Sequence, residues 1–130
     1  MDYTFSKHFS VHEANSLIPG LKKAFAEVQR LSEEAQQRRA EEVKALARGT
    51  NGHKPKRNTS EGATALANQI LTEIAGLGIV VQDWRRGLVD FPHVTPEGEE
   101  VFLCYELADG DDIQFYHELD SGYAGRKPLD

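Results

Sequence analysis

Apolar side chains recur every three or four residues along the first third of the chain, which is the spacing of one stripe on an α-helix. The stripe comprises Leu17, Leu21, Ala24, Phe25, Val28, Leu31 and Ala35, and it returns at Val43 and Leu46. Ser10 stands three residues before Glu13, the capping-box arrangement that begins a helix. We therefore predict a long helix over residues 10–48, with a kink or a break near Ser16–Gly20 because Pro19 lacks a backbone donor.

A second, shorter helix is predicted over residues 62–77. Its stripe consists of Leu66, Ile70, Ile74 and Leu77. Gly76 and Gly78 are residues of the type that ends helices. The intervening residues 49–61 are polar and include two glycines and a proline before Gly62, so they predict a mobile linker. Two striped helices joined in this way fold most simply as an antiparallel hairpin.

From residue 79 onward, β-branched and aromatic residues alternate with short segments rich in Gly, Pro and Asp. The pattern predicts four strands, at Ile79–Gln82, Leu88–Phe91, Glu100–Leu107 and Ile113–Leu119. Pro92 is expected to end the second strand. We expect one α+β domain over residues 1–130, in which the long antiparallel helical hairpin packs on a small antiparallel four-stranded β-meander over residues 79–119, followed by a tail at 120–130.

Composition narrows the class of protein. The 130 residues include 15 Lys and Arg against 21 Asp and Glu, which gives a formal net charge of −6 and argues against nucleic acid or an anionic membrane as a partner. No apolar run approaches the roughly 18 residues that a membrane span needs. The first residues lack a basic-then-apolar signal peptide, and Cys104 is the single cysteine, so we expect a cytoplasmic protein without an internal disulfide.

Two stretches carry a recognisable combination of residues. One is FSVHEANSLIP at residues 9–19, and the other runs from GLVDFP at 87–92 through VFLCY at 101–105 to YHELDSGYAGR at 116–126. Together they resemble the prokaryotic domain of unknown function 2203 family over nearly the full chain, most specifically in the HELD and GYAGR segments. The resemblance implies a bacterial cytoplasmic domain and brings no established activity with it.

The densest polar cluster is formed by His117, Glu118 and Asp120. Because strand side chains alternate, His117 shares a face with apolar neighbours and is expected to face the helices. A buried imidazole there needs a partner, and the candidates besides a backbone carbonyl are Asn15, Glu13 and Asp90. One interpretation is a core histidine that fixes the strand against the first helix.

The other interpretation of His117 is a metal ligand or general base, because neutral imidazole binds Zn, Fe or Ni and titrates near neutral pH. The candidate ligands for Zn, Mn, Fe or Ni are His117, Glu118, Asp120 and His12, with Glu13, Asp90 and His93 as further candidates. The sequence has no His-Glu-x-x-His motif, no Cys pair and no His-x-His motif. Such a site would therefore have to assemble from distant segments, and no other cofactor is expected.

Further residues leave alternatives open. Arg126 follows a Gly-Tyr-Ala-Gly segment, which suits either an anion pocket or a turn whose guanidinium pins the C-terminus to Asp120, Asp90 or Glu118. Cys104 lies mid-strand and is interpreted as a buried structural thiol.

Two further polar segments each allow a structural and a functional interpretation. Trp84, with Arg85 and Arg86, suits either a partner contact or a ring folded over the sheet edge. The basic residues at 48–57 are interpreted as a solvated loop rather than an anion or nucleic-acid contact.

Two functional hypotheses follow. The first is a non-enzymatic interaction module, because the long helix extends beyond the reach of the shorter one and its apolar stripe is most simply covered by a second copy in a homodimer. The alternative is a small metal-binding protein or metal-dependent hydrolase that uses His117, Glu118 and Asp120, with Arg126 orienting an anionic substrate.

Overall fold

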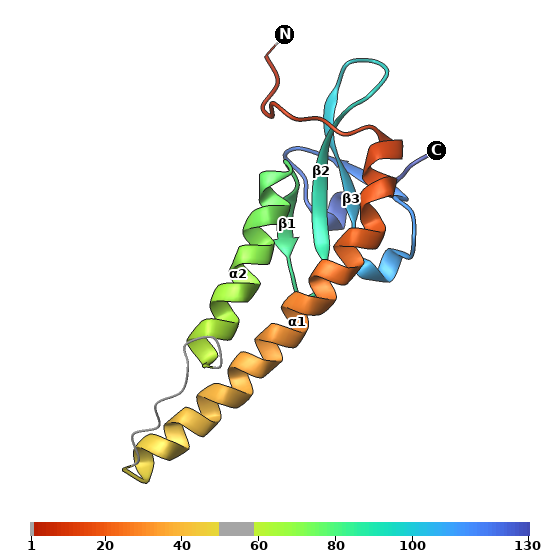
Figure 1. Cartoon of the computed structure of the whole chain (residues 1–130). Helices are drawn as coiled ribbons and strands as arrows, with labels where there is room; N and C mark the ends of the chain where they lie inside the picture. Colours follow the sequence, from red (N-terminus) through yellow and green to blue (C-terminus); the bar gives the residue numbers. More distant parts are fainter. Residues whose placement is uncertain (1, 50–58) are drawn as a thin grey trace.

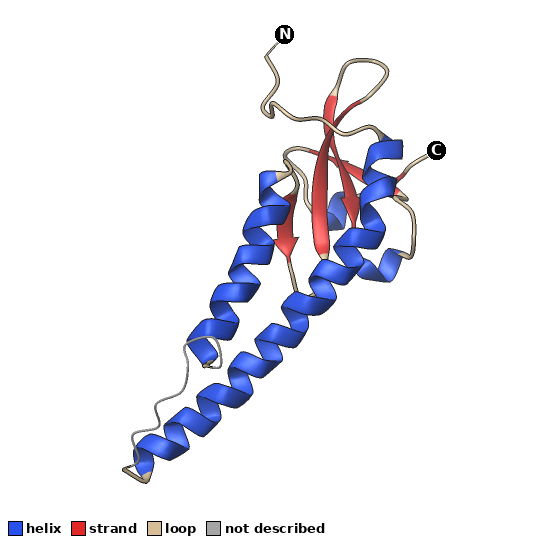
Figure 2. Cartoon of the chain, viewed as in Figure 1, coloured by secondary structure: helices blue, strands red, loops and turns tan. Residues whose placement is uncertain are grey.

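The structure is a computed structural model that describes residues 2–49 and 59–130. Two helices, α1 (Val11–Ala47) and α2 (Ser60–Gly76), precede a sheet of β1 (Val80–Asp83), β2 (Leu88–Val94), β3 (Glu100–Tyr105), β4 (Phe115–Glu118) and β5 (Lys127–Pro128). Two 3₁₀ turns, Leu107–Asp109 and Tyr123–Gly125, flank β4. The sheet is an antiparallel meander in the order β1-β2-β3-β4-β5 (Figures 1 and 2). The α+β class and the helical hairpin are confirmed, but the sheet has five strands rather than the predicted four.

Helix α1 begins at the predicted capping box. The Ser10 hydroxyl accepts the Glu13 N–H at 3.0 Å, and the Glu13 carboxylate accepts the Ser10 N–H at 3.2 Å. The expected break near Pro19 is wrong, since α1 is helical from Val11 to Ala47. A proline costs the helix one hydrogen bond, and the fully buried Ile18 next to it holds this turn against the core.

Helix α2 packs against the middle of α1 through small side chains. Ala63 and Ala67 cover Val28 and Leu31, and all four are buried. Alanines leave little side chain between the backbones, so the two helices approach closely. At its N-terminus, the Ser60 hydroxyl and N–H donate to the Glu42 carboxylate at 2.7 and 3.1 Å. The linker predicted at 49–61 falls largely on residues 50–58, which lie outside the described residues.

The main core lies between the helical hairpin and one face of the sheet. Phe25 of α1 belongs to the same buried cluster as Phe91 and Tyr105 of the sheet, and none of the three is exposed. Burying a side chain of this size contributes about 1.5–3 kcal/mol. Trp84 packs against this main core and against the smaller cluster that α1 and α2 form between them. Its ring therefore covers the sheet edge, and the Arg85 guanidinium lies 4.6 Å from the ring centroid. The far half of the hairpin extends beyond the sheet (Figure 1).

Strand β2 continues past Pro92, contrary to the prediction that this proline ends it. β1 pairs with β2 no further than Asp90, so Pro92 lies where that side of β2 has no strand neighbour. Its carbonyl points to this side and accepts the Phe9 N–H at 2.7 Å. Because N and C=O of one strand residue point the same way, the missing N–H of Pro92 costs the β2–β3 ladder nothing.

Neither described helix combines the length and apolarity that crossing a bilayer requires.

Candidate functional site

Strand register places three chemically active side chains on one face of the sheet. Asp90 of β2 pairs with Cys104 of β3, and His117 of β4 pairs with Phe102, two residues before Cys104. Since alternate residues share a face, Asp90, Cys104 and His117 all lie on the face turned away from the helices. Each is at most 2% exposed.

The prediction that His117 faces the helices is therefore wrong. β4 begins at Phe115, so Ile113 does not belong to the strand alternation from which the prediction was made. The helix-facing position is taken by Tyr116, which pairs with Leu103 and packs against the main core.

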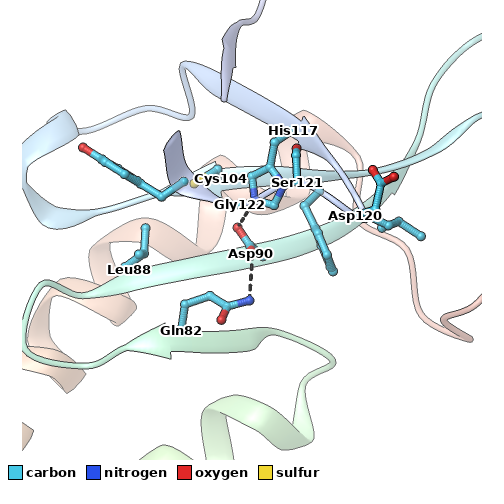
Figure 3. Close-up of a pocket in the computed structure, with 11 residues that line it drawn as sticks. Gln82, Leu88, Asp90, Cys104, His117, Asp120, Ser121 and Gly122 are labelled. Carbon is cyan, nitrogen blue, oxygen red and sulfur yellow. Dashed lines mark hydrogen bonds and ion pairs between the residues drawn. The ribbon is translucent and has the colours of Figure 1, made fainter. Parts of the chain in front are cut away.

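Both ring nitrogens of His117 have partners. Nδ1 lies 2.8 Å from the Glu118 carbonyl oxygen, and Nε2 lies 3.0 Å from Asp90 Oδ1. The other carboxylate oxygen of Asp90 accepts a hydrogen bond from Gln82 Nε2 at 3.0 Å. Figure 3 shows Asp90 between Gln82 and His117, joined to each by a dashed line.

The hydrogen-bond geometry of this pair accommodates a shared cation. A backbone carbonyl can only accept, so Nδ1 of His117 carries a hydrogen. With Nδ1 as the donor, Nε2 and the carboxylate oxygen Asp90 Oδ1 are two acceptors 3.0 Å apart, and a positive species shared between them satisfies both. That species is either one proton, held by the imidazole or the carboxyl group, or a metal ion bound by both atoms.

Cys104 completes the cluster. One ligand atom from each of Asp90, Cys104 and His117 lies within 4.8 Å of the other two. Burial, followed by the negative charge of Asp90, raises the pKa of the Cys104 thiol to about 12, although the Arg126 guanidinium acts in the opposite direction. The free thiol therefore stays protonated at neutral pH and is a poor nucleophile, but it can still bind a metal, which deprotonates a coordinating thiol.

A pocket of about 500 Å³ opens onto this cluster. Figure 3 draws the 11 lining residues: Gln82, Leu88, Asp90, Phe102, Cys104, His117, Leu119, Asp120, Ser121, Gly122 and Tyr123. β1, β2, β3 and β4 supply the floor, and the segment after β4 supplies a wall. The structure thus brings Asp120 to the same pocket as His117.

The N-terminal segment contacts one of the lining residues, Phe102. The Phe5 ring lies 5.3 Å from Phe102, whose ring in turn lies 5.4 Å from His117. The segment is held by Glu100, which accepts the N–H groups of Thr4 and Phe5 at 2.8 and 3.0 Å and lies 2.7 Å from His8 Nε2. Burial alone raises the pKa of Glu100, but these hydrogen bonds outweigh it and lower the pKa to about 2.

Arg126 does not face the pocket. Its two terminal nitrogens donate to Asp109 at 2.8 and 2.9 Å, and one lies 3.5 Å from Glu106. The guanidinium also stacks on Phe115 and Tyr123, 4.0 and 4.3 Å from the ring centroids. Arg126 therefore pins the tail, as one interpretation expected, but through Asp109 and Glu106 rather than Asp120, Asp90 or Glu118.

The remaining predicted site residues lie elsewhere. Glu13 caps α1 and pairs with Lys7, and the Asn15 side chain accepts the Ile113 N–H at 2.7 Å. His12 is exposed on α1. The Glu118 carboxylate pairs with Lys127 at 2.7 Å, and only the backbone carbonyl of Glu118 meets His117.

Two site residues escaped the sequence analysis. Gln82 was assigned to a strand without a role, and Cys104 was treated as structural. The available signal was Asp90, a lone carboxylate in the apolar run Leu-Val-Asp-Phe, which demands buried polar partners. The register that identifies those partners is not readable from one strand alone.

A family model described as an uncharacterized conserved protein, DUF2203, matches residues 7–129. The chain belongs to the DUF2203 family. The resemblance found in the sequence is confirmed, and the match includes Asp90, Cys104 and His117 of this DUF2203 protein. No curated protein and no solved structure matches the chain.

Proposed function

We propose that this DUF2203 protein binds one divalent transition-metal ion through Asp90, Cys104 and His117. The observation that carries the proposal is the contact between His117 Nε2 and Asp90 Oδ1 at 3.0 Å, made while Nδ1 is committed to a carbonyl. A metal ion satisfies both acceptors at once and also recruits the nearby thiol.

The donor set favours zinc-like ions. Thiolate and imidazole select Zn and related transition metals over Mg and Ca, which prefer oxygen ligands. In a tetrahedral zinc site the ligand atoms lie about 3.3–3.5 Å apart. The His117–Asp90 separation is already close to this value, and the longest separation in the cluster, at most 4.8 Å, has to shorten by about 1 Å.

Residues around the cluster supply the supporting contacts that metal ligands need. Metal-binding histidines usually donate their other N–H to a carbonyl or carboxylate, as His117 does to Glu118. Gln82 holds the second oxygen of Asp90, and Arg126 lies 3.9 Å from the Cys104 sulfur, where it favours the thiolate. Three protein ligands leave a fourth position for water or a small molecule on the pocket side.

This ligand set differs from the one predicted from the sequence, which grouped Glu118, Asp120 and His12 with His117. The Glu118 side chain alternates to the helix-facing side of β4 and pairs with Lys127. His12 lies on α1, across the sheet from the cluster. Asp120 lines the pocket and is not part of the proposed set.

The test is stoichiometric metal binding by chelator-treated protein. We expect one equivalent of Co²⁺ to produce a thiolate-to-cobalt charge-transfer band, and Zn²⁺ to abolish it by displacement. Cys104→Ser should remove the band, and His117→Gln should weaken binding at least about tenfold. His12→Gln is the matched control, because His12 is exposed on α1. Folding of each variant is checked by circular dichroism.

Absence of the band in folded wild-type protein at micromolar Co²⁺ would contradict the proposal. So would a band of equal strength in Cys104→Ser. Either result leaves the proton as the species shared by His117 and Asp90.

A second function, self-association through the helical hairpin, is supported by exposed apolar side chains. Val43 and Leu46 of α1 are 57% and 73% exposed, and Leu66 of α2 is 46% exposed. The start of α2 lies beside Glu42, where Ser60 donates to the Glu42 carboxylate, so only the C-terminal end of α1 extends beyond α2. The apolar surface that a second copy would cover on α1 is therefore that of Val43 and Leu46. We expect a homodimer by light scattering at micromolar concentration and a monomer for Val43→Ser/Leu46→Ser; a wild-type monomer would exclude this function.

A further inference from the structure

We infer, on the basis of the proposed metal site, that its open position takes a neutral nitrogen donor with an apolar body and disfavours anions. The pocket chemistry around the cluster points to this class of ligand. It replaces the anionic substrate that the sequence analysis paired with Arg126.

The charge of the loaded centre and its pocket disfavours an anion. Asp90 and the Cys104 thiolate already balance a divalent ion, so the loaded centre carries no surplus positive charge for an anion. Asp120 adds a negative charge at the pocket wall. None of the 11 lining residues drawn in Figure 3 is Lys or Arg. An anion entering this pocket therefore meets net repulsion.

The nearest guanidinium, that of Arg126, is already bound by carboxylates outside the pocket. Arg126 approaches the Cys104 sulfur, but both of its terminal nitrogens are bound by Asp109. Glu106 lies against it and also accepts from Arg86 at 2.8 Å. The two arginines and two carboxylates neutralise one another, so this group offers no free positive charge to a pocket ligand.

Apolar walls favour a ligand with an apolar body. Apolar side chains from three parts of the chain face the pocket: Leu88, Phe102, Leu119 and Tyr123. Such walls favour a ligand that carries hydrocarbon or an aromatic ring beside its donor atom. A neutral nitrogen donor coordinates a zinc-like ion without adding negative charge, so it satisfies both the metal and the walls.

The experiment compares imidazole with azide on the Co²⁺-loaded protein. Both bind through nitrogen, but imidazole is a neutral ring at pH 8 and azide is a small anion, so the comparison contrasts the proposed ligand class with an anion, and the effect of Asp120→Asn on each probe isolates charge. Binding is followed by the change in cobalt absorption. We expect imidazole to bind at least about tenfold more tightly than azide. Asp120→Asn should strengthen azide binding about three- to tenfold and change imidazole binding less than about twofold.

Asp112→Asn is the matched control, because Asp112 is exposed in the turn before β4 and does not line the pocket. Azide binding as tight as imidazole, or equal effects of Asp120→Asn on both probes, would overturn the inference while leaving the metal site intact. Failure to load Co²⁺ at all would instead overturn the proposed function, and the inference with it.

Discussion

The Nε2 atom of His117 lies 3.0 Å from Asp90 Oδ1, and the two residues are each only 2% exposed. With the other N–H of His117 donated to the Glu118 carbonyl, the two facing atoms are both acceptors, which a shared proton or metal ion would satisfy. A buried pair of this kind is costly to break, because removing one member strands the other without a partner.

Asp90→Ala should therefore lower the free energy of unfolding by about 3 kcal/mol in metal-free protein. The loss includes the Gln82 hydrogen bond as well as the His117 contact. Urea denaturation at pH 7 measures it, with Asp112→Ala as the exposed control. A loss below about 1 kcal/mol would mean that the Asp90–His117 contact is not formed in the folded protein.

Acid should loosen the N-terminal segment through Glu100. Its pKa is lowered from 4.5 to about 2, so the folded state binds fewer protons there than the unfolded state. The stabilisation is therefore fully present above about pH 4.5 and is lost as the pH falls toward 2.

Glu100→Gln should flatten the fall in stability between pH 5 and pH 2 and should lower stability at pH 7. Urea midpoints across this range measure both effects. Glu97→Gln is the control, since Glu97 lies in the exposed turn between β2 and β3. An unchanged acid limb in Glu100→Gln would show that this carboxylate does not hold the segment.

Cys104 should resist a thiol reagent in the folded, metal-free protein. It is 1% exposed, and burial raises the pKa of its thiol to about 12, so little thiolate is present at pH 8. We expect labelling by a disulfide reagent to follow unfolding, with rapid reaction only in denaturant. Complete labelling of the native protein within a minute would show that the thiol is open to solvent.

Arg126→Lys should release the tail that forms one pocket wall. Lysine keeps the charge but cannot donate two parallel hydrogen bonds to Asp109 or stack on Phe115 as a guanidinium does. We expect a loss of about 1–3 kcal/mol and faster amide hydrogen exchange over residues 121–125. Arg39→Lys, at an exposed position on α1, should change neither quantity. Unaltered exchange in Arg126→Lys would mean that other contacts hold the wall.

Local patterns predicted the parts of this fold that depend on neighbours in the chain. The Ser10–Glu13 cap and the apolar stripes were sufficient for both helices, since helix ends and faces are local properties. The prediction that Pro92 ends a strand was wrong because a proline loses a hydrogen bond only where a strand lies on the side of its missing N–H. β1 pairs with β2 no further than Asp90, so no strand lies on that side of Pro92.

The site was harder to predict because it depends on register. Shifting a strand by one residue moves every side chain to the other face, and the choice between His117 and Tyr116 rested on where β4 begins. Asp90 was a candidate from the outset, but its pairing with Cys104 across two strands is a property of the assembled sheet.

X-ray absorption spectroscopy of the zinc-loaded protein tests the proposed centre most directly. We predict one sulfur at about 2.3 Å and nitrogen or oxygen ligands at about 2.0 Å, with the sulfur lost in Cys104→Ser. A first shell of oxygen and nitrogen alone in the wild-type protein would contradict the proposal that Asp90, Cys104 and His117 bind the metal together.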